Sequence, residues 1–141
     1  MALGILVIGG CESKSGLELF PVRGEVTYKG KPVPEGTVAY LPQGSGSRQA
    51  TGAIQPDGTF ALMTRQQDDG AMRGSYNIAI YAYKPHPGEP KTREAHEALA
   101  RTGGLKRQFL IPEKYTDPTT SGLTDTVDEN HPGFKKLELT D

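Results

Sequence analysis

Short segments in which apolar and polar residues alternate recur along this chain of 141 residues. In the strongest of them, 75–83, Tyr76, Ile78 and Ile80 share one face. A period of two is typical of a half-buried β-strand, because successive side chains of a strand point to opposite faces. The chain is therefore expected to fold mainly into strands.

Turn-forming residues separate these segments. Gln55-Pro56-Asp57-Gly58 is a hairpin turn, since Pro presets φ and Asp-Gly supplies the left-handed positions of a tight turn. The expected strands are 19–28, 37–41, 50–54, 59–64, 75–83, 109–111, 123–127 and 135–139. Seven to eight short strands at close spacing favour an all-β antiparallel β-sandwich over an α/β fold.

One helix is expected, over 92–101, as a short insert in the sandwich. Ala95, Ala98 and Leu99 recur at helical spacing, Thr92 can cap the start and Gly103 can end it. A helix of about ten residues is too short to persist without docking.

Composition excludes several classes of protein. The length suits one domain, and a single cysteine allows neither an intrachain disulfide nor a cysteine-based metal cluster. The net charge is -1, whereas a nucleic-acid binder has a basic surface, so no nucleic-acid partner is expected.

The N-terminal residues predict a location. The apolar run Ala2–Gly10 is shorter than the 20 or so residues of a membrane span but matches the core of a secretory signal. The run ends in Ile8-Gly9-Gly10-Cys11, which resembles the lipobox of bacterial lipoproteins. That resemblance implies cleavage between Gly10 and Cys11 and acylation of the Cys11 thiol, which would anchor the protein to a membrane.

Three regions follow from this interpretation: a signal peptide over 1–10, a lipidated tether over 11–19 and a β-sandwich domain over 20–141. Met1–Gly10 contains no Lys or Arg, whereas a signal peptide begins with positive charge, so either the true start is expected upstream or the signal peptide is expected to be truncated here. The alternative is a buried N-terminal strand with an inert cysteine.

Charge is distributed unevenly. Residues 84–107 carry six basic and three acidic residues, whereas 112–141 carry seven acidic and three basic residues. Either both are solvated surfaces, or the basic insert docks an acidic partner or an anionic envelope polymer. The residues expected on such a partner surface are Tyr81, Tyr83, Lys91, Arg93, Arg101, Lys106 and Arg107.

Residues that carry catalysis or bind metal are sparse. No serine lies in a G-x-S-x-G motif, and His86, His96 and His131 lack close metal-ligand spacing, so they are expected to be solvated. The acidic segments 68–69 and 125–129 lack the regular spacing of a calcium loop and are expected to be polar turns. No cofactor, metal or catalytic residue is predicted.

Four further segments resemble a known family. They are Gly24–Pro42, Asp57–Phe60, Gly74–Ile80, and Ile111–Tyr115 followed by Thr120–Thr124. Together they resemble the carboxypeptidase regulatory-like, or transthyretin-like, β-sandwich domains of small planctomycete lipoproteins. The resemblance implies a transthyretin-like or Ig-like sandwich over roughly 20–139.

Every residue of these motifs also has a structural role. The expected core positions are Val26, Val38, Tyr40, Phe60, Leu62, Tyr76, Ile78 and Ile80. Tyr76 and Tyr115 are expected to bury their rings and to bond backbone groups through their hydroxyls. Transthyretin-like sandwiches include a hydroxyisourate hydrolase family, but its Tyr-Arg-Gly-Ser ending is absent, so that activity is not expected.

The function expected from these residues is non-enzymatic binding or scaffolding by a cell-envelope lipoprotein. The loops 43–49, 65–74 and 84–107 would present the binding surface. Tyr81 and Tyr83 form either a small sugar-binding platform or support for the second sheet or the helix. Alternative functions are an accessory domain of an envelope hydrolase or transporter, and a structural coat component.

Overall fold

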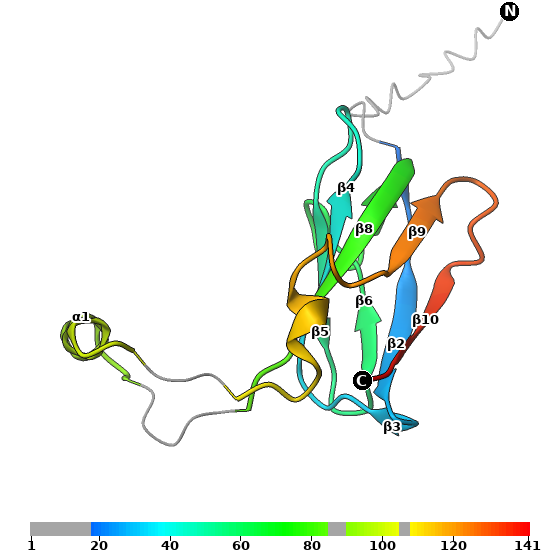
Figure 1. Ribbon diagram of the computed structural model, residues 1–141. Helices are drawn as coiled ribbons and strands as arrows, with labels where there is room; N and C mark the ends of the chain where they lie inside the picture. The colour runs from blue at the N-terminus through cyan, green and yellow to red at the C-terminus, as the bar shows by residue number, and fades with distance from the viewer. Residues whose placement is uncertain (1–17, 85–89, 105–107) are drawn as a thin grey trace, which may run out of the picture.

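A computed structural model describes residues 18–84, 90–104 and 108–141 of the chain. It is an all-β sandwich with one helical insert, as the alternating pattern predicts (Figure 1). These residues contain ten strands, but β1, β3 and β7 have two residues each, which leaves seven longer strands.

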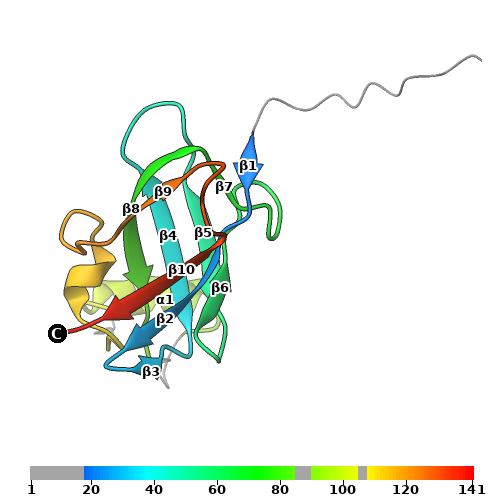
Figure 2. The same ribbon diagram turned by 90° about the vertical axis from the view of Figure 1, so that its right-hand side faces the viewer.

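The first sheet is built around β2 (Arg23–Tyr28). On one side β2 pairs with β10 (Phe134–Leu139), and on the other with β6 (Thr59–Ala61) and β3 (Lys31–Pro32). The β2–β10 pair is parallel, with Val26 opposite Leu137. The sandwich is therefore not antiparallel throughout, because the first long strand and the last run side by side in the same direction (Figure 2).

The second sheet has the strand order β5-β4-β8-β9 and is antiparallel throughout. Its strands are β4 (Gly36–Pro42), β5 (Ala50–Ile54), β8 (Gly74–Tyr81) and β9 (Thr124–Val127). A single bridge between Thr51 and Met63 links the β5 edge to the segment after β6, which joins the two sheets along one side.

A small two-stranded sheet, β1 (Leu19–Phe20) with β7 (Ala71–Met72), lies where the described chain begins. Gly70 makes this pair possible. A Cβ on that residue would lie 1.9 Å from the Phe20 carbonyl oxygen, and the backbone has a φ of +87°.

The core lies between the two four-stranded sheets. All eight core positions expected from the sequence are buried, and Val26, Tyr40, Tyr76 and Ile78 are fully so. Tyr40 and Tyr76 pack with ring centroids 5.6 Å apart, and the Tyr76 hydroxyl donates to the Met72 carbonyl oxygen at 2.8 Å. The backbone bond expected for Tyr76 is therefore confirmed.

Two helical segments interrupt the strands. The 3-10 helix η1 (Glu113–Thr116) packs beside β8, and the Tyr115 hydroxyl donates to the Thr140 carbonyl oxygen at 2.8 Å and accepts from the Thr140 N–H. Tyr115 thus fastens the chain end as expected. The helix α1 (Arg93–Arg101) has Thr92 as its N-cap, also as expected, and none of its residues is buried.

Candidate functional site

The insert leaves the sandwich at the opposite end of β8 from the point where the described chain enters. β8 starts directly after β7, the partner of β1, and ends just before the insert. Its eight residues span about 26 Å. In Figure 2, β1 lies at the upper end of the sandwich and α1 behind its lower end.

A short stem supports the insert. Tyr83 and Phe109 form a single antiparallel bridge with their ring centroids 5.1 Å apart, where a strand over 109–111 was expected. The Lys84 N–H donates to the Gln108 carbonyl oxygen, and the Leu110 N–H to that of Ala82. The Tyr83 ring therefore packs at the base of the insert.

The structure brings together only part of the expected partner surface. Lys91, Arg93 and Arg101 are exposed on or next to α1, where Arg93 pairs with Glu97 at 3.1 Å. Tyr81 is half-buried on the outer face of the second sheet. Four of the expected site residues lie outside the described residues, namely Gly10, Cys11, Lys106 and Arg107, as does His86.

The α1 helix has an apolar side without a covering element among the described residues. Ala95, Ala98 and Leu99 recur at helical spacing and so lie on this side. Of the helix residues only Leu99 is even half-buried. Figure 1 shows α1 standing clear of both sheets.

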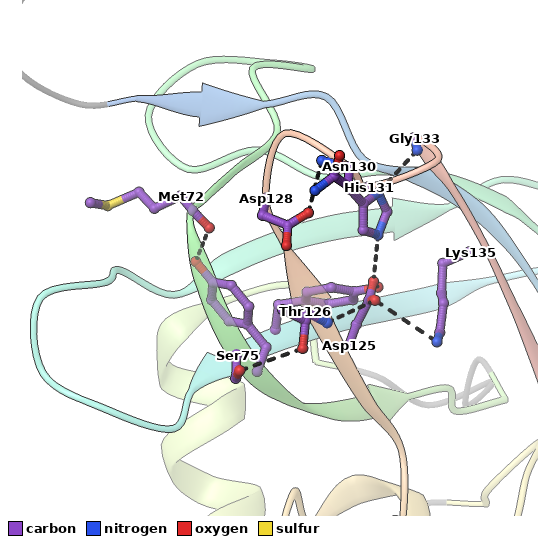
Figure 3. Close-up of polar contacts among 11 residues, drawn as sticks. Met72, Ser75, Asp125, Thr126, Asp128, Asn130, His131, Gly133 and Lys135 are labelled. Atoms are coloured by element: carbon purple, nitrogen blue, oxygen red, sulfur yellow. Dashed lines mark hydrogen bonds and ion pairs between the residues drawn. The ribbon is translucent and has the colours of Figure 1, made fainter.

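A second feature is a buried polar cluster between β9 and β10 that sequence reasoning missed (Figure 3). The Asp125 carboxylate accepts from the Tyr40 hydroxyl at 2.8 Å and lies 2.9 Å from His131 Nε2. Lys135 Nζ lies 3.9 Å from the other oxygen of the Asp125 carboxylate. The side chains of His131 and Asp125 are only 3% and 9% exposed, so the prediction that His131 is solvated is wrong.

Hydrogen bonds define how His131 is held. The Gly133 N–H donates to Nδ1 at 3.0 Å, so Nδ1 carries no proton and Nε2–H donates to Asp125. Both ring nitrogens are thus used within the protein. Burial, the Asp125 charge and the bond to Asp125 together raise the pKa of Tyr40 far above its ordinary value of 10.0. The cluster stabilises the turn between β9 and β10.

The acidic turn after β6 is also organised by backbone bonds. The Asp69 carboxylate accepts from the N–H groups of Thr64, Arg65 and Gln66 at 2.6–2.9 Å. Desolvation opposes these bonds, but together they outweigh it and lower the pKa of Asp69 below its ordinary value of 3.8. The described residues contain no group of three or more potential His, Cys, Asp or Glu metal ligands.

A groove of about 800 Å³ on the outside of the sandwich is the third feature; we call it the Phe134 groove. Phe134 and Met63, the two large apolar side chains that are exposed in the described structure, both line it at 48% and 47% exposure. Small residues also line it, namely Gly52, Ala53 and Ala61. The sequence carries one sign of this exposed side chain. In the alternation of β10, Phe134 falls on the opposite face from the buried Leu137 and Leu139.

Two opposite charges line the Phe134 groove. Arg23 lies between Phe134 and Ala61 in the register of the first sheet, and Asp68 comes from the turn after β6. Neither side chain forms an ion pair within the described part of the chain. The groove therefore combines exposed apolar surface with one unpaired cation and one unpaired anion.

Comparisons with protein-family models, curated proteins and solved structures found no match to this chain. Over residues 18–84, 90–104 and 108–141, no helix is both long and apolar enough to cross a membrane.

Proposed function

We propose that this protein is a cell-envelope lipoprotein that acts as a binding module rather than an enzyme. Cys11 carries the lipid, and the sandwich holds α1 away from the membrane. One observation carries the proposal: the chain enters at one end of β8 and the insert leaves at the other. A tether at the first end therefore directs the insert toward its partner.

The buried cluster does not favour His131 as a catalytic base. Both nitrogens of His131 bond groups of the protein, and the Asp125 carboxylate is shared by Tyr40 and His131. A histidine that acts as a base needs a nitrogen within reach of the substrate. Action as the accessory domain of an envelope hydrolase or transporter would use the same presented insert.

The anchor is tested by expressing the full chain in a bacterium that processes lipoproteins. We expect the protein to partition into the detergent phase of Triton X-114, with an intact mass that shows Cys11 as the acylated first residue. Cys11→Ser should move it to the aqueous phase, whereas the matched variant Ser13→Ala should leave partitioning unchanged. A membrane-extracted wild-type protein without acyl mass would contradict the anchor.

A further inference from the structure

We propose that α1 of one copy docks into the Phe134 groove of a second copy of this chain. The inference rests on the proposed function in one respect, since α1 is the element that the sandwich presents. It goes further by naming the partner.

The first observation is that α1 is short and has an uncovered apolar side. Nine residues are too few for a stable isolated helix in water, because nucleation costs more than so few hydrogen bonds return. None of the residues of α1 is buried, and the side with Ala95, Ala98 and Leu99 is not covered by any described element. A helix of this kind gains most of its stability by packing its apolar side against a partner.

The second observation is that the Phe134 groove has the size and the lining to accept a helix. Its volume of about 800 Å³ lies at the upper end of the range for ligand sites. Three of the residues that line the groove have small or no side chains, namely Gly52, Ala53 and Ala61. A helix with alanines at the contact can therefore approach the groove closely. Phe134 and Met63 then offer apolar surface to Leu99, the one large apolar side chain of the helix.

The charged residues of the helix and of the groove indicate which side chains pair and in which direction the helix lies in the groove. Glu94 and Arg101 lie two turns apart on one flank of the apolar side, at a separation of about 10 Å along the axis. Neither forms an ion pair within the described residues, and the same holds for Arg23 and Asp68 in the groove. Each surface thus has one unpaired charge of each sign, so Glu94 can pair with Arg23 and Arg101 with Asp68.

The two surfaces differ, so each contact joins the helix of one copy to the groove of another. If two copies exchange helices reciprocally, a closed two-fold dimer forms, whereas successive head-to-tail contacts are heterologous and extend the assembly. A single nine-residue helix covers less than the 1,200–2,000 Å² or so of a standard interface, so association in the micromolar range or weaker is expected.

The test uses the full chain with Cys11→Ser, so that lipid-driven association is removed. Sedimentation velocity over a range of concentrations should show reversible self-association. Leu99→Asp should abolish it, and Glu94→Arg or Arg23→Glu alone should weaken it about tenfold or more. Combining Glu94→Arg with Arg23→Glu should restore most of the affinity. Lys31→Glu, which reverses an exposed charge outside the groove, is the matched control.

Two results would overturn the inference. One is a chain that remains monomeric at millimolar concentration. The other is self-association in which the Glu94→Arg, Arg23→Glu pair recovers nothing. Crosslinking in intact cells separates this failure from failure of the proposed function. If Leu99→Asp removes crosslinks to another envelope component while purified protein stays monomeric, α1 binds a different partner and the presented-insert function stands.

Discussion

At the scale of single residues, Asp125 organises one edge of the sandwich. Its carboxylate accepts from Tyr40 in the core and from His131 in the turn between β9 and β10, and also from the Thr126 N–H. A buried carboxylate is tolerated only when such partners replace the water that it has lost. Asp125 therefore links the core to the turn.

We expect Tyr40→Phe to change how stability depends on alkaline pH. The raised pKa of Tyr40 means that its stabilising contribution is complete below about pH 10 and is lost as pH rises further. At pH 8 the variant should be less stable by about 1–3 kcal/mol, because the bond to Asp125 is missing. Between pH 10 and 11.5 this difference should shrink.

Urea titrations of both proteins at each pH would measure the difference. The values at pH 8, where Tyr40 is protonated in the folded and the unfolded state, serve as the internal control. A constant difference up to pH 11.5 would show that Tyr40 is not protected in the folded protein.

Residues on a strand's buried face were predictable, and His131 was not. Tyr76, Ile78 and Ile80 follow from alternation alone, since each lies on a regular strand. His131 lies in a turn, and its burial depends on Asp125 and on Gly133 bonding its ring. No local pattern marks such a contact.

At the scale of elements, η1 and β10 close the side of the sandwich where β9 and β10 are not paired with each other. Lys135 points inward from β10 toward Asp125, and an inward charge on an edge strand discourages pairing with other chains. Tyr115 fastens the end of β10 through both backbone groups of Thr140.

Tyr115→Phe should loosen the end of β10 without unfolding the sandwich. The ring remains in the core, but Thr140 loses a donor and an acceptor, so we expect a loss of about 1–2 kcal/mol. Amide exchange at Thr140 and Leu139 should quicken, as followed by NMR. Tyr81→Phe, which removes a hydroxyl from a half-buried ring on the outer face of the second sheet, is the matched control and should leave this exchange nearly unchanged.

Element bounds were predicted to within two residues for the strands whose apolar residues alternate regularly. The strand expected over 50–54 has those bounds in the structure, and the strand expected over 75–83 is β8, from Gly74 to Tyr81. The pairing of β2 with β10 was not predictable, because it depends on the path of the whole chain. The two-residue strands β1, β3 and β7 are too short to carry any period.

At the scale of the whole molecule, the sandwich and the insert are expected to be energetically separate. The core lies between the two sheets, and α1 contributes no buried residue. Replacing 85–107 with Asn-Gly, which forms a tight two-residue turn, should therefore leave a folded sandwich.

We expect the free energy of unfolding of this deletion variant to lie within about 1 kcal/mol of that of the full chain. Near-UV circular dichroism and urea titration would measure it, with the full chain as control. Loss of the near-UV signal would mean that the insert stabilises the sandwich. The same variant should not self-associate.

The parallel pairing of β2 with β10 has a consequence for biosynthesis. Leu137 lies 111 positions after its partner Val26, so the first sheet stays incomplete until β10 has been made. Contacts between residues so distant in sequence form slowly, because the long loop between them must first close at a cost in conformational entropy. The first sheet therefore cannot be completed before β10 has left the ribosome, whereas the second sheet needs only residues up to Val127.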